Sequence, residues 1–310
     1  MQECSERGYD ERMQQQGERW GTHYLAESRQ WIAWLEHPLI GEHYARAMND
    51  CDGVYWIDYI KAHMGGPARR SLDLGCASGF RSFGIYDAGA SLSIEGTDVS
   101  GDMIADAERQ RAARGAPGQF WQTDVNTLKL EPGTYDLIFS CHAFHHFVEL
   151  EHIMQEVHDA LTPNGLFMLE EYVGPSQFQW PDEQMALVRA LLAFLPDDLR
   201  RFRWGEVKVE EIRMDPEVLD ANSPFEAIRS SDIVPLFEKY FDVVFTRSLG
   251  GTIQHLLYNG IIHNFDPEDA EACAYIEAIA AAEDAFIRSG LLRADFQLLL
   301  GRQKSDHGSR

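Results

Sequence analysis

The chain is short of the features that mark secreted, membrane or zinc-binding proteins. Its 310 residues include five cysteines without a CxxC pair: Cys4, Cys51, Cys76, Cys141 and Cys273. This scatter argues against a zinc module and against a disulfide framework. No apolar run approaches the length of a membrane span, and the N-terminus is polar and acidic where a signal peptide would be basic and then apolar. We expect a cytoplasmic protein without a membrane partner.

Basic residues are also scarce, because 27 Lys and Arg face 50 Asp and Glu, for a net charge of −23. Such a surface repels phosphates, so a nucleic-acid substrate is not expected. The densest basic cluster, 200–204, is interpreted as a solvated helix end or lid, with a clamp for an anionic small substrate as the alternative. The 45% hydrophobic content is enough for a large core, and nothing repeats at a fixed period.

The most informative motif is an apolar strand that runs into a small-residue turn over 72–80. Gly75 and Gly79 permit backbone angles closed to other residues and a close approach by a ligand, and Asp73 adds a carboxylate. The second glycine of a dinucleotide fingerprint is replaced by Ala77, and no Lys-Ser or Lys-Thr of a phosphate-binding loop follows. The motif favours a nucleotide-like cofactor without a pyrophosphate, although a purely structural turn is the alternative.

Further strands with acidic ends follow the turn. Residues 91–98 read as a second strand ending at Asp98, some twenty residues downstream, as a ribose-binding carboxylate requires. Residues 119–125 resemble a third strand whose Asp124 is placed to accept from an adenine amino group. Residues 135–140 have the pattern of a buried parallel strand.

In this order the motifs resemble those of the class I S-adenosylmethionine-dependent methyltransferases, over roughly 70–172. The resemblance implies an α/β fold with a seven-stranded, mostly parallel, doubly wound sheet and S-adenosylmethionine as cofactor. A turn at Leu161–Gly165 would precede the fifth strand, 166–169. The cofactor contacts that it implies are Asp73, Gly75, Cys76, Ala77, Gly79, Phe80, Asp98, Val99, Met103, Asp124, Val125, Ser140 and His142.

Five segments are expected. Residues 1–69 should form a polar, partly disordered tail (1–20) and an aromatic helical cap, with helices near 24–35 and 45–60. The aromatic residues of this cap either pack on the core or close over the cofactor. Residues 70–175 should form the cofactor-binding core, and 176–235 a helical substrate lid with a helix from 182. Residues 236–304 should complete the sheet, with a helix from 270 capped at 266–268 and a last strand at 294–300, before a tail, 305–310.

Catalytic candidates follow the fourth and fifth strands. A histidine or a tuned carboxylate there can remove a proton from an acceptor, and we favour His145, His146 and Glu171 over His142. Adjacent Glu170 and Glu171 should face opposite ways. With Glu170 and Glu171 nearby in the sheet, two histidines and one of these carboxylates could ligate a divalent ion, but the favoured interpretation is that none binds. His255 and His263 are expected on a helix, in the core or at the surface.

The leading hypothesis is a methyltransferase acting on a small polar metabolite, natural-product intermediate or sugar, with O- or N-methylation favoured. One alternative keeps the cofactor but cyclises or cleaves it without an external acceptor. Another is a non-catalytic cofactor-binding protein. The acceptor and the assembly, including a homodimer, are left open.

Overall fold

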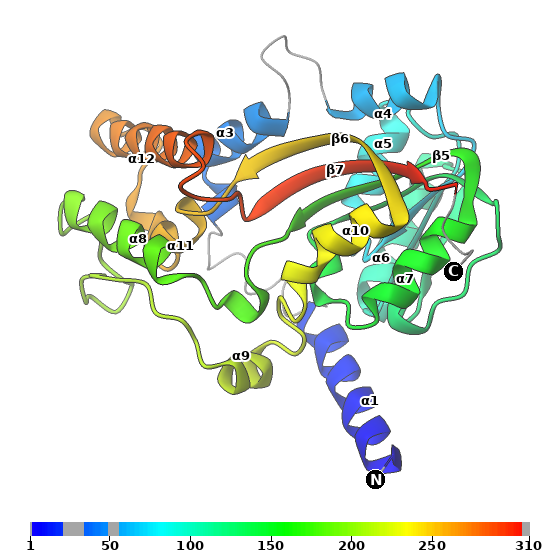
Figure 1. The fold of residues 1–310 in the computed structure, drawn as a ribbon, viewed down its shortest axis with the longest axis horizontal. Helices are drawn as coiled ribbons and strands as arrows, with labels where there is room; N and C mark the ends of the chain where they lie inside the picture. The colour runs from blue at the N-terminus through cyan, green and yellow to red at the C-terminus, as the bar shows by residue number, and fades with distance from the viewer. Residues whose placement is uncertain (1, 21–33, 49–55, 306–310) are drawn as a thin grey trace.

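The computed structural model describes residues 2–20, 34–48 and 56–305, and Figure 1 shows a central sheet flanked by helices. The strand order is β3-β2-β1-β4-β5-β7-β6. Strands β1 to β5 pair in parallel, and β7 is antiparallel to both of its neighbours. The predicted seven-stranded, mostly parallel α/β fold is therefore confirmed. The strands are β1 Ser71–Leu74, β2 Ile94–Asp98, β3 Gly118–Gln122, β4 Tyr135–Cys141, β5 Leu161–Tyr172, β6 Phe241–Gly250 and β7 Phe296–Gln303.

Helices cover both faces of this sheet because successive strand residues point to opposite sides. Ile138 and Phe167 belong to a buried cluster with α7 and α10, whereas Leu137 and Phe139 belong to a second cluster with α3, α4 and α5. The near-continuous apolar pattern of β4 reflects burial on both faces. The covering helices are α3 Pro38–Met48, α4 Trp56–Met64, α5 Phe80–Asp87, α6 Gly101–Arg114, α7 Leu150–Ala160 and α10 Ile233–Tyr240.

The N-terminal segment corrects one expectation. Residues 1–20 were predicted to be partly disordered, but Gln2–Glu18 form α1, which extends away from the sheet (Figure 1). Tyr9, Met13, Gln16 and Trp20 recur at helical spacing, and Met13 and Gln16 are buried. The predicted helix near 24–35 lies mostly outside the described residues, and the one predicted near 45–60 corresponds to α3 and α4.

Two further expectations need correction. Strand β5 begins at Leu161, which pairs with Tyr135 of β4. The register then shifts, and the next pair is Leu137 with Leu166. The turn predicted at 161–165 is therefore an irregularity within the strand. The long helix α12, Ala270–Arg288, is capped by Asp269, whose side chain accepts from Glu271 N, and not by residues 266–268.

The segment between β5 and β6 consists of helices joined by loops, and its role as a substrate lid stays a prediction. It contains η5 Ser176–Phe178, α8 Asp182–Phe194, α9 Pro216–Asn222 and η6 Ser230–Asp232. Elements α8, α11 (Gln254–Tyr258) and α12 share a third apolar cluster, and η7 (Ile262–Asn264) contributes to it. In the described ranges, no helix has both the length and the apolarity to cross a membrane.

Candidate functional site

The glycine turn connects β1 to α5 at the carboxyl end of the sheet. Gly75 and Gly79 have positive φ angles of 75° and 83°, and a Cβ on Gly75 would lie 2.4 Å from the Cβ of Ala143. Ala77 also adopts a positive φ of 46°, and its N–H donates to Asp98 Oδ2 at 2.9 Å. The turn is thus closed by a carboxylate from the next strand.

Asp98 links the loop that follows β1 to the loop that follows β2. Its Oδ1 accepts from Ser100 N at 2.8 Å, beside the bond from Ala77. Burial raises the pKa of Asp98, although these backbone N–H groups act in the opposite direction. A carboxylate accepts about four hydrogen bonds, so it retains capacity for two ribose hydroxyls.

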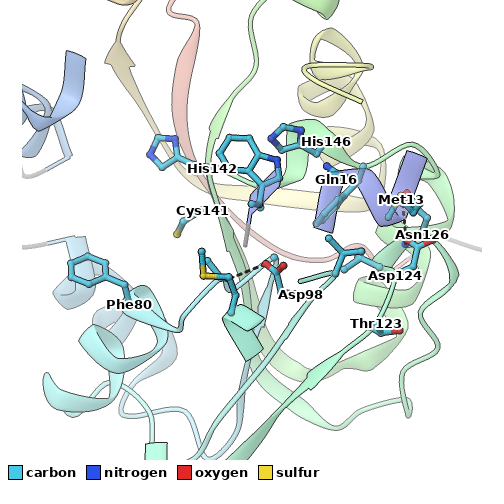
Figure 2. A pocket seen from close by; sticks show the side chains of 18 residues that line it. Met13, Gln16, Phe80, Asp98, Thr123, Asp124, Asn126, Cys141, His142 and His146 are labelled. Carbon is cyan, nitrogen blue, oxygen red and sulfur yellow. Dashed lines mark hydrogen bonds between the residues drawn. The ribbon is translucent and has the colours of Figure 1, made fainter. Parts of the chain in front are cut away.

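Gly75, Ala77 and Asp98 border one cavity of about 420 Å³, a volume typical of small-molecule sites. Figure 2 shows Asp98 near its centre, with Phe80, Cys141 and His142 on one side and Asp124 and Asn126 on the other. The lining consists of Met13, Gln16, Trp20, Gly75, Ala77, Phe80, Asp98, Val99, Met103, Thr123, Asp124, Val125, Asn126, Cys141, His142, Ala143, His146 and Phe147.

The helix α1 closes the Asp124 end of this cavity. Tyr9 Oη donates to Asp124 Oδ2 at 2.9 Å, and Oδ1 of the same carboxylate accepts from Asn126 N and Nδ2. Burial and then Asp124 raise the pKa of Tyr9. The sequence prediction missed α1 altogether, although the spacing of Tyr9, Met13 and Trp20 in an otherwise polar segment was an available signal.

Most of the predicted cofactor contacts reach the cavity wall, but four do not. Asp73 is 2% exposed and accepts from Ser82 Oγ at 2.7 Å, and burial raises its pKa to about 7. Ser140 Oγ donates to Leu74 O at 2.7 Å. Cys76 belongs to a small apolar cluster with Phe83 and Phe120, and Gly79 lies against the same two rings. These four residues therefore support the turn on the side away from the cavity.

Of the three predicted catalytic residues, one reaches the cavity wall and two do not. His146 lines the cavity, whereas His145 and Glu171 lie outside its lining. Glu171 is fully buried and accepts from Ala143 N at 2.9 Å, Phe144 N at 2.6 Å and Tyr172 N at 2.6 Å. His145 Nδ1 lies 2.5 Å from Glu171 Oε1.

The electrostatics of the two histidines differ. Burial alone lowers the pKa of His145, but Glu171 and Glu226 outweigh burial and raise it to about 10. Burial and the adjacent His145 lower the pKa of His146 to about 4. Glu226 comes from the insertion, and its Oε1 lies 3.4 Å from His145 Nε2. No motif in the sequence pointed to Glu226, because only the tertiary fold brings it to η4, Phe144–His146.

Glu170 and Glu171 face different partners, as the alternation of a strand requires. Glu170 Oε1 accepts from Arg81 Nη2 at 2.8 Å and lies 3.1 Å from His142 Nε2. Burial raises the pKa of Glu170, but His142 and Arg81 outweigh it and lower the pKa. Of the remaining histidines, His255 lies in α11 and packs near Tyr172, and His263 lies in η7.

The donors and the shape of the site fit a nucleoside cofactor. Asp98 offers acceptors for ribose, Met103 and Val125 offer apolar contact, and Asp124 lies at the far end of the same cavity. The fold and the cavity together define a Rossmann-like protein with a site for a nucleoside cofactor that lacks a pyrophosphate.

The family comparison agrees with this class. Residues 72–165 match the family model described as a methyltransferase domain. This part of the chain is therefore similar to methyltransferase domains, in agreement with the class I type and the S-adenosylmethionine cofactor that the motifs of the sequence imply.

Three curated relatives share this region. Demethylmenaquinone methyltransferase of Thermus thermophilus is 26% identical over 34% of this chain and 49% of its own length. Malonyl-[acyl-carrier protein] O-methyltransferase of Enterobacter lignolyticus is 33% identical over 32% and 39%. tRNA U34 carboxymethyltransferase of Alcanivorax borkumensis is 29% identical over 44% of each. The chain thus spans less than half the length of these relatives.

Solved structures show a broader, weaker similarity. An S-adenosylmethionine-dependent methyltransferase from Mesorhizobium loti is 20% identical, with a TM-score of 0.46 over 81% of this chain and 99% of that one. The [4+2]-cyclase SpnF is 16% identical, with a TM-score of 0.46 over 80% and 79%.

Proposed function

We propose that this protein transfers a methyl group from S-adenosylmethionine to a hydroxyl or amine of a small polar metabolite, sugar or natural-product intermediate. One observation carries the proposal: Gly75 and Ala77 of the glycine turn lie on the wall of one cavity together with Asp98 and Asp124. The net charge of −23 favours a small acceptor over a nucleic acid.

The cofactor supplies an electrophilic methyl group on a sulfonium when it is bound, so the chain's own residues have to bind and orient the two reactants. Asp98 would accept from the ribose hydroxyls and Asp124 would hold the adenine end. His146 and Trp20 would contact the acceptor, since both line the cavity and their rings pack edge to face with centroids 5.4 Å apart. His145 and Glu171 would act behind the wall as positioning residues.

Calorimetry with S-adenosylmethionine and S-adenosylhomocysteine tests the cofactor assignment. We expect both to bind the wild-type chain, and Asp98→Ala to lose about 1.5 to 3 kcal/mol because charge-assisted bonds to the ribose disappear. Asp242→Ala, at an exposed position of β6, is the matched control and should bind as wild type does. Failure of the folded wild-type protein to bind either compound would rule out the proposal.

The nucleoside product distinguishes methyl transfer from the alternative use of the cofactor. Incubation with a panel of small hydroxyl and amine acceptors should release S-adenosylhomocysteine. Release of methylthioadenosine without an acceptor would instead indicate attack on the aminocarboxypropyl chain.

A further inference from the structure

Two histidines and a carboxylate meet beside the cavity, and of the three, His146 is part of its lining. His145, His146 and Glu226 each offer one ligating atom, and these atoms lie within 4.8 Å of one another. His145 and His146 are neighbours in η4, with ring centroids 4.2 Å apart, and Glu226 arrives from the segment between α9 and η6. The separation of 3.4 Å between His145 Nε2 and Glu226 Oε1 suits two ligands of one ion.

His146 provides an independent observation. It is 8% exposed, and its Nδ1 is buried without a hydrogen-bond partner in the part of the chain that the structure describes. Buried polar atoms in proteins are nearly always paired, so an unpartnered ring nitrogen on a member of this cluster calls for a ligand. Histidine nitrogens and carboxylate oxygens are the donor set of Zn²⁺ and related ions.

Surrounding groups hold the cluster in position. Histidine ligands usually donate their second ring N–H to a carboxylate, and His145 Nδ1 meets Glu171 Oε1 in this way at 2.5 Å. Glu171 is itself fixed by the backbone N–H groups of Ala143 and Phe144. Glu226 Oε2 accepts from Ser223 Oγ at 2.8 Å, which leaves Oε1 toward His145.

The backbone around Glu226 is also unusual. Phe225 and Ala227 have positive φ angles of 63° and 47°, so non-glycine residues in the left-handed region flank the carboxylate on both sides. Arg229 anchors this segment to α7 through both oxygens of Glu151, each at 2.7 Å, and to the loop before α7 through Val148 O at 3.0 Å. Strain of this kind persists where surrounding contacts over-determine it, often at ligand sites.

We propose that His145, His146 and Glu226 bind one divalent transition-metal ion, Zn²⁺ in the first instance, with Glu171 as the positioning residue for His145. This proposal departs from the sequence-based expectation of no metal. Three protein ligands would leave a coordination position open. Because His146 lines the cavity, an acceptor in the cavity could reach that position. The role of the open position, to hold an acceptor oxygen and lower its pKa, rests on the proposed methyl transfer.

Equilibrium dialysis of the chelator-treated full chain against Zn²⁺, followed by elemental analysis, tests the site. We expect one tightly held equivalent. Glu226→Gln and His146→Gln should each weaken binding at least tenfold, and Glu171→Gln should weaken it by about 10- to 100-fold. His63→Gln is the matched control, because His63 bonds Tyr59 O within α4 and should leave Zn²⁺ binding unchanged. Thermal unfolding by circular dichroism identifies any variant that fails to fold.

Co²⁺ gives a second readout, because its visible absorption reports nitrogen and oxygen coordination directly. Absence of Zn²⁺ and Co²⁺ binding by the folded wild type, or equal binding by Glu226→Gln and His146→Gln, overturns the proposal. Calorimetry with S-adenosylhomocysteine on the same samples separates the two claims. Cofactor binding without metal binding removes the metal site alone, and metal binding without cofactor binding removes the proposed function alone.

Discussion

At the scale of single residues, Asp73 is a buried carboxylate whose hydrogen-bond partner is a neutral hydroxyl. Its pKa of about 7 exceeds the value of about 3.9 in an unfolded chain, so the native state binds more protons between these values. The stabilisation that this proton provides is complete below about pH 4 and is lost as the pH rises to 7, at up to about 1.4 kcal/mol per unit.

Asp73→Asn tests this assignment. The variant should gain about 2 to 3 kcal/mol of unfolding free energy relative to wild type between pH 5 and pH 8, because it has no proton to lose. Urea unfolding at both pH values measures the difference, with Asp242→Asn as a control that should show none. Since Asp73 is not on the cavity wall, the variant should also keep its affinity for S-adenosylmethionine. Parallel pH profiles, or a large loss of affinity, would return Asp73 to the list of direct contacts.

Single residues also show how far the sequence could predict the site. Asp98 and Asp124 follow from pattern alone, because parallel strands bring their carboxyl ends to one edge of the sheet. Asp73 has the expected residue type, but its hydrogen bond to Ser82 turns it away from the cavity. Glu226 could not be predicted, because its place depends on how an insertion folds back onto η4 through side-chain contacts remote in sequence.

At the scale of elements, strands were easier to predict than the helices that cover the site. The fourth and sixth strands could be predicted because each is an apolar run that must be buried on at least one face of the sheet. The helix α1 was missed because its sequence is polar on most sides, and its order depends on contacts with distant residues. Arg12 pairs with Asp220, and its guanidinium lies 4.1 Å from the centroid of the Phe225 ring.

This dependence predicts that Arg12→Ala loosens α1. Loss of one partly exposed ion pair and one cation–π contact should cost about 1 kcal/mol of local stability, or roughly fivefold in the opening equilibrium. Hydrogen exchange of residues 9–18 should accelerate accordingly, and S-adenosylhomocysteine should slow it again because Met13 and Gln16 line the cavity. Gln15→Ala, on the exposed side of α1, should exchange as wild type does. Equal exchange in both variants would mean that Arg12 does not hold the helix.

At the scale of the whole molecule, the net charge of −23 supports the proposal of a small acceptor over a nucleic acid, although one relative is named for a tRNA modification. Part of the densest basic segment, 200–204, is already engaged within the protein. Arg200 pairs with Asp197 at 2.5 Å, Arg201 donates to Gly205 O at 3.0 Å, and the rings of Phe202 and Trp204 stack on each other.

We therefore expect bulk tRNA to bind more weakly than about 100 μM at physiological salt, the weak end of non-specific binding. Fluorescence anisotropy of labelled tRNA over a range of KCl concentrations measures this. Binding that tightens steeply as salt falls and disappears in Arg200→Ala/Arg201→Ala would contradict the prediction, because it would identify 200–204 as a phosphate-binding patch strong enough to overcome the acidic surface. A flat response in both proteins would agree with a small acceptor, since a neutral metabolite reaches the cavity without crossing an electrostatic barrier.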